Sequence, residues 1–183
     1  MGVQKEITIS GVGGQGMIAC GTMIAEAAVL HDHKRATLSS EYGVETRGTF
    51  AKSDVIVSDE EIYFPDVTEP DLVVCLHQVA YERYSGKIRP EALLVYSSDD
   101  VVPDPSREAR ERGLPITKEA KEIGGPAVAN ILTMGVIVGL LDVVAPEAAK
   151  EAIRRFFAKK GEKVVALNEK AFERGLELGA GLK

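Results

Sequence analysis

A glycine-rich turn lies between a strand-like run and a helix-like run near the start of the sequence and limits the folds that the chain can adopt. A short, mostly β-branched run at residues 7–10 stops at Gly11, and the turn reads Gly11-x-Gly13-x-x-Gly16. Residues 17–30 follow with apolar side chains at helical spacing. In such a turn the first glycine permits the tight bend, the second lets an anion approach the backbone, and the third allows close packing. The pattern predicts an anion-binding turn, and a tight turn without a ligand is the alternative.

The residues around the turn exclude one kind of phosphate site and weaken another. Met17 and Ile18 stand where a P-loop needs a lysine and a hydroxyl residue. A dinucleotide fold places an acidic residue about 20 residues further on, and Glu41 comes several residues late for that purpose. Amide groups at the start of the helix are still expected to face an anion. The candidate site residues in this segment are Gly11, Gly13, Gly14, Gln15, Gly16 and Met17.

Strand-like and helix-like segments alternate along the rest of the chain. Continuous apolar runs such as residues 72–76 are typical of parallel strands that are covered on both faces. We expect strands at residues 35–39, 49–57, 72–76, 92–96 and 114–116, and helices at 79–85, 117–124, from 126, from 146 and at 165–179. This alternation predicts an α/β fold, a three-layer α/β/α sandwich on a mainly parallel, Rossmann-like sheet with extra C-terminal helices. The length of 183 residues fits a single domain at 1–183.

The composition excludes several classes of partner and cofactor. The net charge is −6 and Trp is absent, so no nucleic-acid partner is expected. The only two cysteines, Cys20 and Cys75, are too few for an iron–sulfur cluster or a structural zinc site, and we expect buried free thiols. His31 and His33 are expected to lie exposed at a helix end rather than to bind a metal.

One uncharged stretch, residues 124–141, reaches the lower limit of membrane-spanning length. Because it contains glycines, a proline and polar residues and has no basic flank, we expect a buried helix and no membrane partner. No secretory leader pattern is present at the N-terminus, so the expected location is cytoplasmic. Gly135 and Gly139 allow another element to approach closely. We expect a partner subunit to supply part of that cover, so that leucine at both positions weakens subunit association.

A second candidate segment is the loop at residues 39–49, which holds two glycines, one arginine and two acids. Arg47 can bind a carboxylate or phosphate through its planar fork, or it can pair with Glu45 or Glu41 as a structural clamp. His77 directly follows an expected strand, where capping is favoured over ligand binding. Asn130 lies in an apolar helix, where it satisfies a buried loop or contacts a ligand or partner.

These motifs together resemble those of a known family. Gly11-Val12-Gly13-Gly14-Gln15-Gly16 is similar to the GxGGQG signature of the gamma subunits of 2-oxoacid:ferredoxin oxidoreductases. Residues 42–49 resemble that family's Y-G-P-E-x-R-G-G segment, with Val44 in place of the proline and Thr49 in place of the last glycine. Ser58-Asp59-Glu60 and residues 120–124 before Asn130 fit as well, and the resemblance covers residues 7–172.

The resemblance implies a division of labour among subunits. Thiamine diphosphate and the active-site groups belong to alpha and beta subunits, and iron–sulfur clusters belong to the beta subunit or to a ferredoxin-like delta subunit. The gamma subunit is a non-catalytic, Rossmann-like module that packs against them and helps to position coenzyme A, and ferredoxin is reached through the complex. The site residues that the resemblance adds are Tyr42, Gly43, Arg47, Gly48 and Asn130.

The whole complex is then expected to decarboxylate a 2-oxoacid oxidatively to an acyl-CoA while reducing ferredoxin, and the motifs are nearer to those of 2-oxoglutarate enzymes. This chain has no GDG…N thiamine motif, so alone it is expected to hold no cofactor and to be inactive. Two other interpretations stay open. One is a free-standing dinucleotide-binding module or small dehydrogenase, and the other is a scaffold whose glycine turn is empty.

Overall fold

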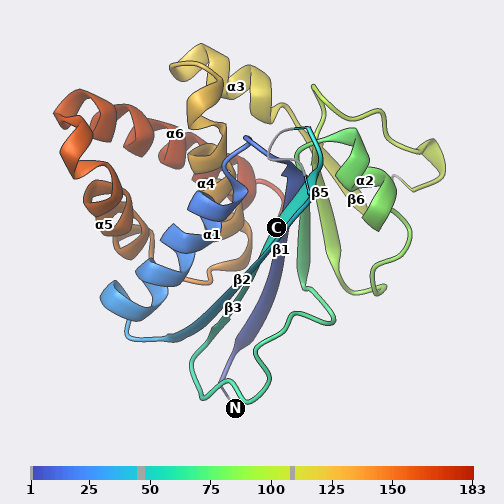
Figure 1. Cartoon of the computed structure of the whole chain (residues 1–183), viewed down its shortest axis with the longest axis horizontal. Helices are drawn as coiled ribbons and strands as arrows, with labels where there is room; N and C mark the ends of the chain where they lie inside the picture. The colour runs from blue at the N-terminus through green and yellow to red at the C-terminus, as the bar shows by residue number, and fades with distance from the viewer. Residues whose placement is uncertain (1, 45–47, 108–109) are drawn as a thin grey trace.

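The computed structural model describes residues 2–44, 48–107 and 110–183, which form a six-stranded sheet with helices on both faces (Figure 1). The strands are β1 (Gln4–Val12), β2 (Arg35–Tyr42), β3 (Phe50–Ser58), β4 (Leu72–Cys75), β5 (Leu93–Ser97) and β6 (Glu111–Leu114). Their order in the sheet is β2-β3-β1-β4-β5-β6. Strands β1, β4, β5 and β6 are parallel, whereas β3 is antiparallel to both of its neighbours. The predicted α/β fold with a mainly parallel sheet is confirmed.

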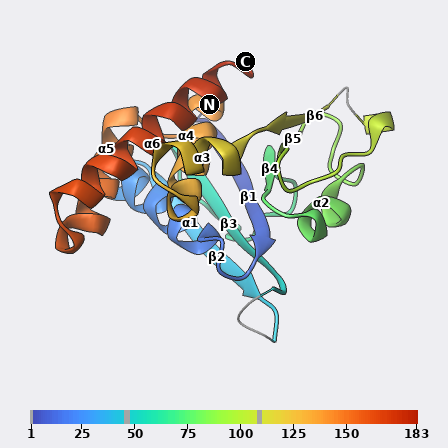
Figure 2. The ribbon, with the colours of Figure 1, turned by 90° about the horizontal axis from the view of Figure 1, so that it is seen from above.

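The helices are unequally divided between the two faces (Figure 2). Helices α1 (Met17–Glu26), α4 (Ala129–Leu141), α5 (Pro146–Phe157) and α6 (Glu162–Ala180) lie on one side, and α3 (Ile116–Ile123) joins them after β6. Helix α2 (Gln78–Tyr84) covers β4 and β5 on the other side. A π-helical turn, Ala27–His31, continues α1, and short 3-10 turns lie at Pro105–Arg107, Pro126–Val128 and Ala158–Lys160.

Side-chain alternation along the strands explains the two apolar clusters that hold these layers together. Ile9 and Val74 belong to the larger cluster under α1 and α4, whereas Val73 and Cys75 belong to the smaller cluster under α2. All four residues of β4 are buried, because this strand is covered on both faces. The continuous apolar run of β4 in the sequence has this cause.

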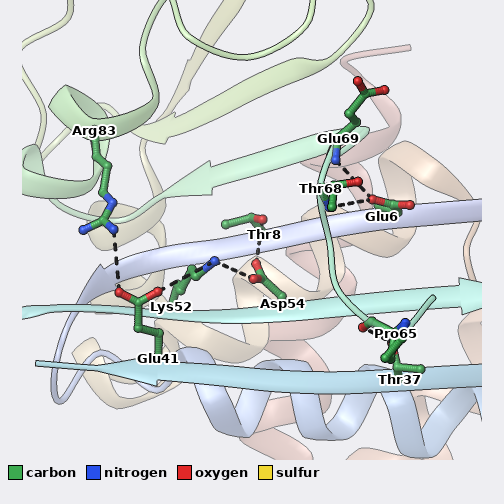
Figure 3. Close-up of polar contacts among 10 residues, drawn as sticks. All are labelled: Glu6, Thr8, Thr37, Glu41, Lys52, Asp54, Pro65, Thr68, Glu69 and Arg83. Carbon is green, nitrogen blue, oxygen red and sulfur yellow. Dashed lines mark hydrogen bonds and ion pairs between the residues drawn. The ribbon is translucent and has the colours of Figure 1, made fainter.

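The face opposite α1 is polar where it crosses β1, β3 and β2. There the Thr8 hydroxyl donates to one Asp54 oxygen at 2.7 Å, and the Lys52 ammonium lies 2.6 Å from the other (Figure 3). Lys52 also lies 3.9 Å from Glu41, which pairs with Arg83 of α2 at 3.6 Å. The segment between β3 and β4 crosses the same face, held by hydrogen bonds to β1 and β2 (Figure 3). The third layer is therefore helical over one half of the sheet and loop-covered over the other.

The strand order and one strand position are not those that the sequence pattern suggests. Strands β1 and β2 are parallel but not adjacent, because β3 returns between them. The strand expected at residues 114–116 lies at Glu111–Leu114, since Pro115 has no amide hydrogen for the ladder and precedes α3 directly. The helix expected at 117–124 begins at Ile116, so Thr117 lies inside it, and its hydroxyl donates to Asp100.

Helix α4 is the buried helix that the uncharged stretch predicts, since residues 131–139 are all buried. Among the described residues no single helix is long and apolar enough to span a membrane, and only a pair bent by 117°, α3 with 126–141, meets the length and composition required. The cover of α4 comes from α6. A Cβ atom at Gly135 would lie 2.2 Å from the Phe172 carbonyl oxygen, and one at Gly139 2.3 Å from that of Leu176. The expectation that a partner subunit packs on these glycines is therefore wrong, because α6 of the same chain occupies that face.

Candidate functional site

The glycine turn lies where the connections of the sheet change sides. Strands β1 and β4 are parallel neighbours. The chain leaves β1 into α1 on one face, toward β2, and leaves β4 into α2 on the other face, toward β5 (Figure 1). The crevice at the carboxyl ends of two such strands is the usual ligand site of open α/β sheets. The fold thus places the turn at residues 11–16 where a ligand is expected.

Two glycines of the turn have backbone conformations that other residues avoid. The φ angle is +98° at Gly14 and +78° at Gly16. Gly16 is the N-cap of α1, and within the described part of the chain no side chain caps the helix there. The first amide groups of α1 therefore lack intrahelical acceptors and carry the positive end of the helix dipole. A Cβ atom at Gly14 would meet nothing within 4 Å, so this part of the turn is open to a ligand.

Gln15 joins the carboxyl ends of two strands. Its Oε1 accepts a hydrogen bond from the Val12 amide at 2.9 Å, and its Nε2 donates to the Leu76 carbonyl at 3.0 Å. A Cβ atom at Gly11 would lie 2.3 Å from that Oε1 and 2.9 Å from the Met17 sulfur. Gly11 therefore makes room for the Gln15 side chain, which holds the crevice between β1 and β4 together.

A pocket of about 390 Å³ lies between the turn and the loop that joins β2 to β3. We call it the turn pocket, and it is lined by Gly13, Gly14, Gly16, Met17, Ile18, Tyr42, Gly43, Thr49 and Ala51. The Gly13 amide donates to the Thr49 carbonyl at 3.0 Å, which fixes the loop beside the turn. The structure thus brings together the two segments that the sequence singles out.

Not every predicted site residue lines the turn pocket. Arg47, with Glu45, lies outside the described residues, so its choice between a ligand and a structural partner stays a prediction. Gly48 has a φ of +76° but does not line the pocket, and Gly11 lies beneath Gln15. Tyr42 is 66% exposed, so its ring forms an outer wall that a ligand can reach.

A second pocket, of about 370 Å³, also borders the turn, and we call it the switch pocket. It is lined by Gly14, Gln15, Gly16, Leu76, Asp100, Ile116, Thr117, Lys121, Pro126, Ala127, Ala129 and Asn130. The Asn130 Nδ2 donates to the Gly16 carbonyl at 3.4 Å, so this residue satisfies the backbone of the turn. The Asn130 Oδ1 is buried and has no hydrogen-bond partner among the described residues. Asn130 therefore combines a structural contact with an unused acceptor.

The histidine and cysteine candidates outside the two pockets have structural roles or are buried. His77 was expected to cap the strand before it; instead it is the N-cap of α2, where its Nδ1 accepts from the Val79 amide at 3.2 Å. Cys20 and Cys75 are buried free thiols, as predicted, and burial raises the pKa of Cys75 to about 12. Within the described ranges no group of three or more His, Cys, Asp or Glu residues could hold a metal ion, the HxH segment included.

The sequence missed most of the switch pocket. Lys121 lies in the family-like segment at 120–124, and no sequence pattern points to Leu76, Asp100 or Thr117 as site residues. Leu76 comes directly after β4, so a known strand order would have placed it beside the turn. The sequence does not reveal that order, because the antiparallel return of β3 has no unique signature.

The dinucleotide interpretation lacks its acidic residue. In a dinucleotide fold the ribose-binding acid ends the strand next to the glycine turn. Here β3 separates β2 from β1, and Glu41 pairs instead with Lys52 and Arg83 on the polar face (Figure 3). This geometry disfavours a ribose contact from Glu41.

Comparison with known proteins points to one family. Residues 6–178 match the family model of pyruvate ferredoxin/flavodoxin oxidoreductase. The 2-oxoglutarate synthase subunit KorC of Methanocaldococcus jannaschii is 38% identical over 183 residues, which covers 98% of this chain and 96% of that protein. The KorC subunit of Archaeoglobus fulgidus is 35% identical, with 96% of this chain and 88% of that protein covered.

Solved structures share the fold over nearly the whole chain. The gamma subunit of a keto/oxoacid ferredoxin oxidoreductase from Geobacter sulfurreducens is 36% identical, with a TM-score of 0.82 and 98% of each chain covered. A 2-oxoglutarate:ferredoxin oxidoreductase from Magnetococcus marinus, with 2-oxoglutarate, coenzyme A and succinyl-CoA bound, matches 98% of this chain at 27% identity and a TM-score of 0.88. The match covers 32% of that longer chain.

Proposed function

We propose that this chain, which belongs to the pyruvate ferredoxin/flavodoxin oxidoreductase family, binds part of coenzyme A beside its glycine turn. It is the gamma subunit of a 2-oxoacid:ferredoxin oxidoreductase. We propose further that the 2-oxoacid is 2-oxoglutarate, which the KorC relatives and the Magnetococcus enzyme carry in their names. The complex then converts 2-oxoglutarate and coenzyme A to succinyl-CoA and carbon dioxide, and the electrons released reduce ferredoxin.

The observation that carries the coenzyme A proposal is the turn pocket. Its uncapped helix terminus and its open backbone at Gly14 suit an anionic group. The side chains of Met17, Ile18, Tyr42 and Ala51 suit the long, uncharged pantetheine arm of coenzyme A. The chain's own contribution is therefore to bind and orient the acyl acceptor.

The two cysteines of this chain do not fit an iron–sulfur cluster. Cys20 and Cys75 belong to apolar clusters on opposite faces of the sheet, so they cannot share one iron–sulfur cluster. We assign thiamine diphosphate, which supplies the decarboxylation chemistry, to the alpha and beta subunits of the same complex. We assign the clusters, which carry electrons, to the beta subunit or a delta subunit. Ferredoxin then meets those subunits, and the isolated chain should be inactive.

The proposal is tested in the assembled complex with Tyr42→Ala. Because this exposed ring forms a wall of the turn pocket, its loss should weaken coenzyme A binding without unfolding the subunit. We expect the KM for coenzyme A to rise about three- to tenfold, the loss of about one aromatic contact, while the KM for 2-oxoglutarate is unchanged. The assay is 2-oxoglutarate-dependent reduction of ferredoxin at varied coenzyme A.

Tyr63→Ala is the matched control, since Tyr63 is 90% exposed on the segment between β3 and β4 and lines neither pocket. Equal KM values for coenzyme A in the wild type and both variants would contradict the proposal. In that case calorimetry with the isolated chain separates the rivals. Binding of NAD without a response to coenzyme A favours the dinucleotide module, and binding of neither favours a scaffold with an empty turn.

A further inference from the structure

We infer that the switch pocket binds a phosphate group of coenzyme A and that Lys121 provides the cation for it. This inference rests on the proposed function and adds a second part to that site. The turn pocket and the switch pocket share Gly14 and Gly16, so the turn itself is the border between them. An extended ligand that crosses the turn occupies both pockets.

The two pockets differ in chemistry as the two ends of coenzyme A do. Apart from the glycines of the turn itself, the turn pocket is lined mainly by apolar and aromatic side chains. The switch pocket adds one lysine, one aspartate, one threonine and one asparagine. Coenzyme A has an uncharged pantetheine arm and a nucleotide end that carries a diphosphate and a 3′-phosphate. We therefore place the arm in the turn pocket and a phosphate in the switch pocket.

Lys121 is the cation of the switch pocket, and its charge is not used within the described part of the chain. Its side chain is exposed on α3 and has no ion pair or hydrogen bond there. A lysine ammonium is a compact cation that binds phosphate oxygens through charge-assisted hydrogen bonds. The uncapped start of α1 adds a partial positive charge to the same pocket.

Carboxylates near Lys121 oppose an anion, and the one that lines the switch pocket accepts hydrogen bonds from the protein. Asp100 lines the pocket, and one of its oxygens accepts hydrogen bonds from the hydroxyls of Ser97, at 2.6 Å, and Thr117. Asp99 and Glu122 lie with Lys121 in an adjoining open depression and do not line the switch pocket. The pocket therefore has two sources of positive charge, the lysine and the helix terminus. It has one carboxylate, whose charge is partly offset by hydrogen-bond donors of the protein.

Asn130 gives a separate indication of a ligand at the same place. Because the Gly16 carbonyl only accepts, the amide nitrogen of Asn130 must face it, which assigns the buried, unpartnered atom to the oxygen. A buried oxygen without a donor is unfavourable. A ribose hydroxyl or the adenine amino group of coenzyme A would supply that donor.

The test compares Lys121→Gln with Lys118→Gln in the assembled complex. Both lysines are exposed on α3, and only Lys121 lines the switch pocket, so the two variants remove the same charge at different places. We expect Lys121→Gln to raise the KM for coenzyme A about five- to tenfold and to leave kcat unchanged. This rise corresponds to the loss of one partly exposed, charge-assisted hydrogen bond. Lys118→Gln should leave this KM within about twofold of the wild type, because a surface charge that touches no ligand is largely screened.

A comparison of coenzyme A with 3′-dephospho-coenzyme A identifies the phosphate. If Lys121 binds the 3′-phosphate, Lys121→Gln leaves the KM for the dephospho compound unchanged. If Lys121 binds the diphosphate, the KM rises equally for both compounds. A Lys121→Gln complex with the wild-type KM for coenzyme A overturns the inference. The proposed function survives that result if Tyr42→Ala still raises the KM, and it fails with the inference if Tyr42→Ala has no effect.

Discussion

Two groups of glycines in this subunit have opposite surroundings. At Gly14 a Cβ atom would meet nothing within 4 Å, and the constraint is the φ angle of +98°. Gly135 and Gly175 lie inside α4 and α6 instead, where a Cβ atom would lie 2.2 Å from the Phe172 carbonyl oxygen and 2.0 Å from that of Leu132. The first position needs glycine because of its own backbone, and the second group needs it because of a neighbouring one.

The difference shows what a glycine pattern in a sequence can and cannot tell. Gly135 and Gly139 face Gly175 and Gly179, so the same four-residue spacing on two helices lets their backbones touch. At this range Cα–H groups approach carbonyl oxygens, which stabilises the contact weakly. The sequence indicates the close approach but not which element makes it. For the turn, likewise, the sequence indicates an unusual backbone conformation but not whether the space next to Gly14 is open to a ligand.

The largest expected effect is on the helix contact. Intrinsic helix propensity favours Gly175→Ala by about 1 kcal/mol. The added methyl group would nevertheless collide with backbone atoms of α4, which cannot move aside as a side chain can. We therefore expect a net loss of about 3 kcal/mol or more in the free energy of unfolding, measured by urea denaturation of the subunit.

Gly181→Ala is the control for the helix contact, because Gly181 ends α6 with a φ of −68° and its Cβ atom would be 3.5 Å from the nearest carbonyl oxygens. This variant should be neutral within about 0.5 kcal/mol. If both variants were equally stable, the close approach of α4 and α6 would not be a constraint on the fold.

The next effect separates binding from stability at the turn. Gly14→Ala places an alanine at a φ of +98°, which should cost about 1–2 kcal/mol of unfolding free energy. Its methyl group would also occupy the open space shared by both pockets, so we expect the KM for coenzyme A to rise about tenfold.

Gly161→Ala is the control that separates binding from stability. Gly161 has a φ of +96° with nothing within 4 Å of its Cβ position, and it lines neither pocket. It should lose stability with an unchanged KM, and a matching rise in KM would assign the Gly14 effect to the fold.

Much of the fold follows from local patterns in the sequence. The strand at residues 72–76 and the helix from 126 are continuous apolar runs because both are covered on several sides. The strand order does not follow, because pairing depends on contacts between distant segments. The polar network of Thr8, Lys52 and Asp54 shows the same limit, since alternating polar residues do not reveal that a loop rather than a helix covers them.

The backbone of the candidate site was more predictable from the sequence than its side chains. The turn and the loop after β2 have glycine signatures, and the structure places them around one pocket. The sequence does not reveal that the Gln15 amide bridges Val12 and Leu76, and a ligand contact of Gln15 stays a prediction. Lys121 has no local signature beyond the family-like segment at 120–124, because an exposed lysine on a short helix is ordinary until the helix is placed beside the turn.

Helix α3 links the two regions, because it borders the switch pocket and is held to α6 by an ion pair. Two nitrogens of the Arg174 guanidinium, Nε and Nη2, each donate a hydrogen bond to Glu119 at 2.8 Å. These bonds hold the pKa of Glu119 below its ordinary value of 4.5. A carboxyl group whose pKa is lowered by folding stabilises the protein above its ordinary pKa, and that contribution is lost as the pH falls through the lowered pKa.

The smallest expected effect is therefore a pH-dependent one on Glu119→Gln. At pH 7 the variant should lose about 1 kcal/mol or less of unfolding free energy, because the Arg174 side chain is 40% exposed and solvent screens the pair. The difference from the wild type should shrink as the pH is lowered below 4.5. Glu177→Gln removes a more exposed partner of the same arginine, with 70% of its side chain exposed, and should cost less. A Glu119→Gln deficit that is the same at neutral and acidic pH would show that packing, and not the ion pair, holds α3 between the turn and α6.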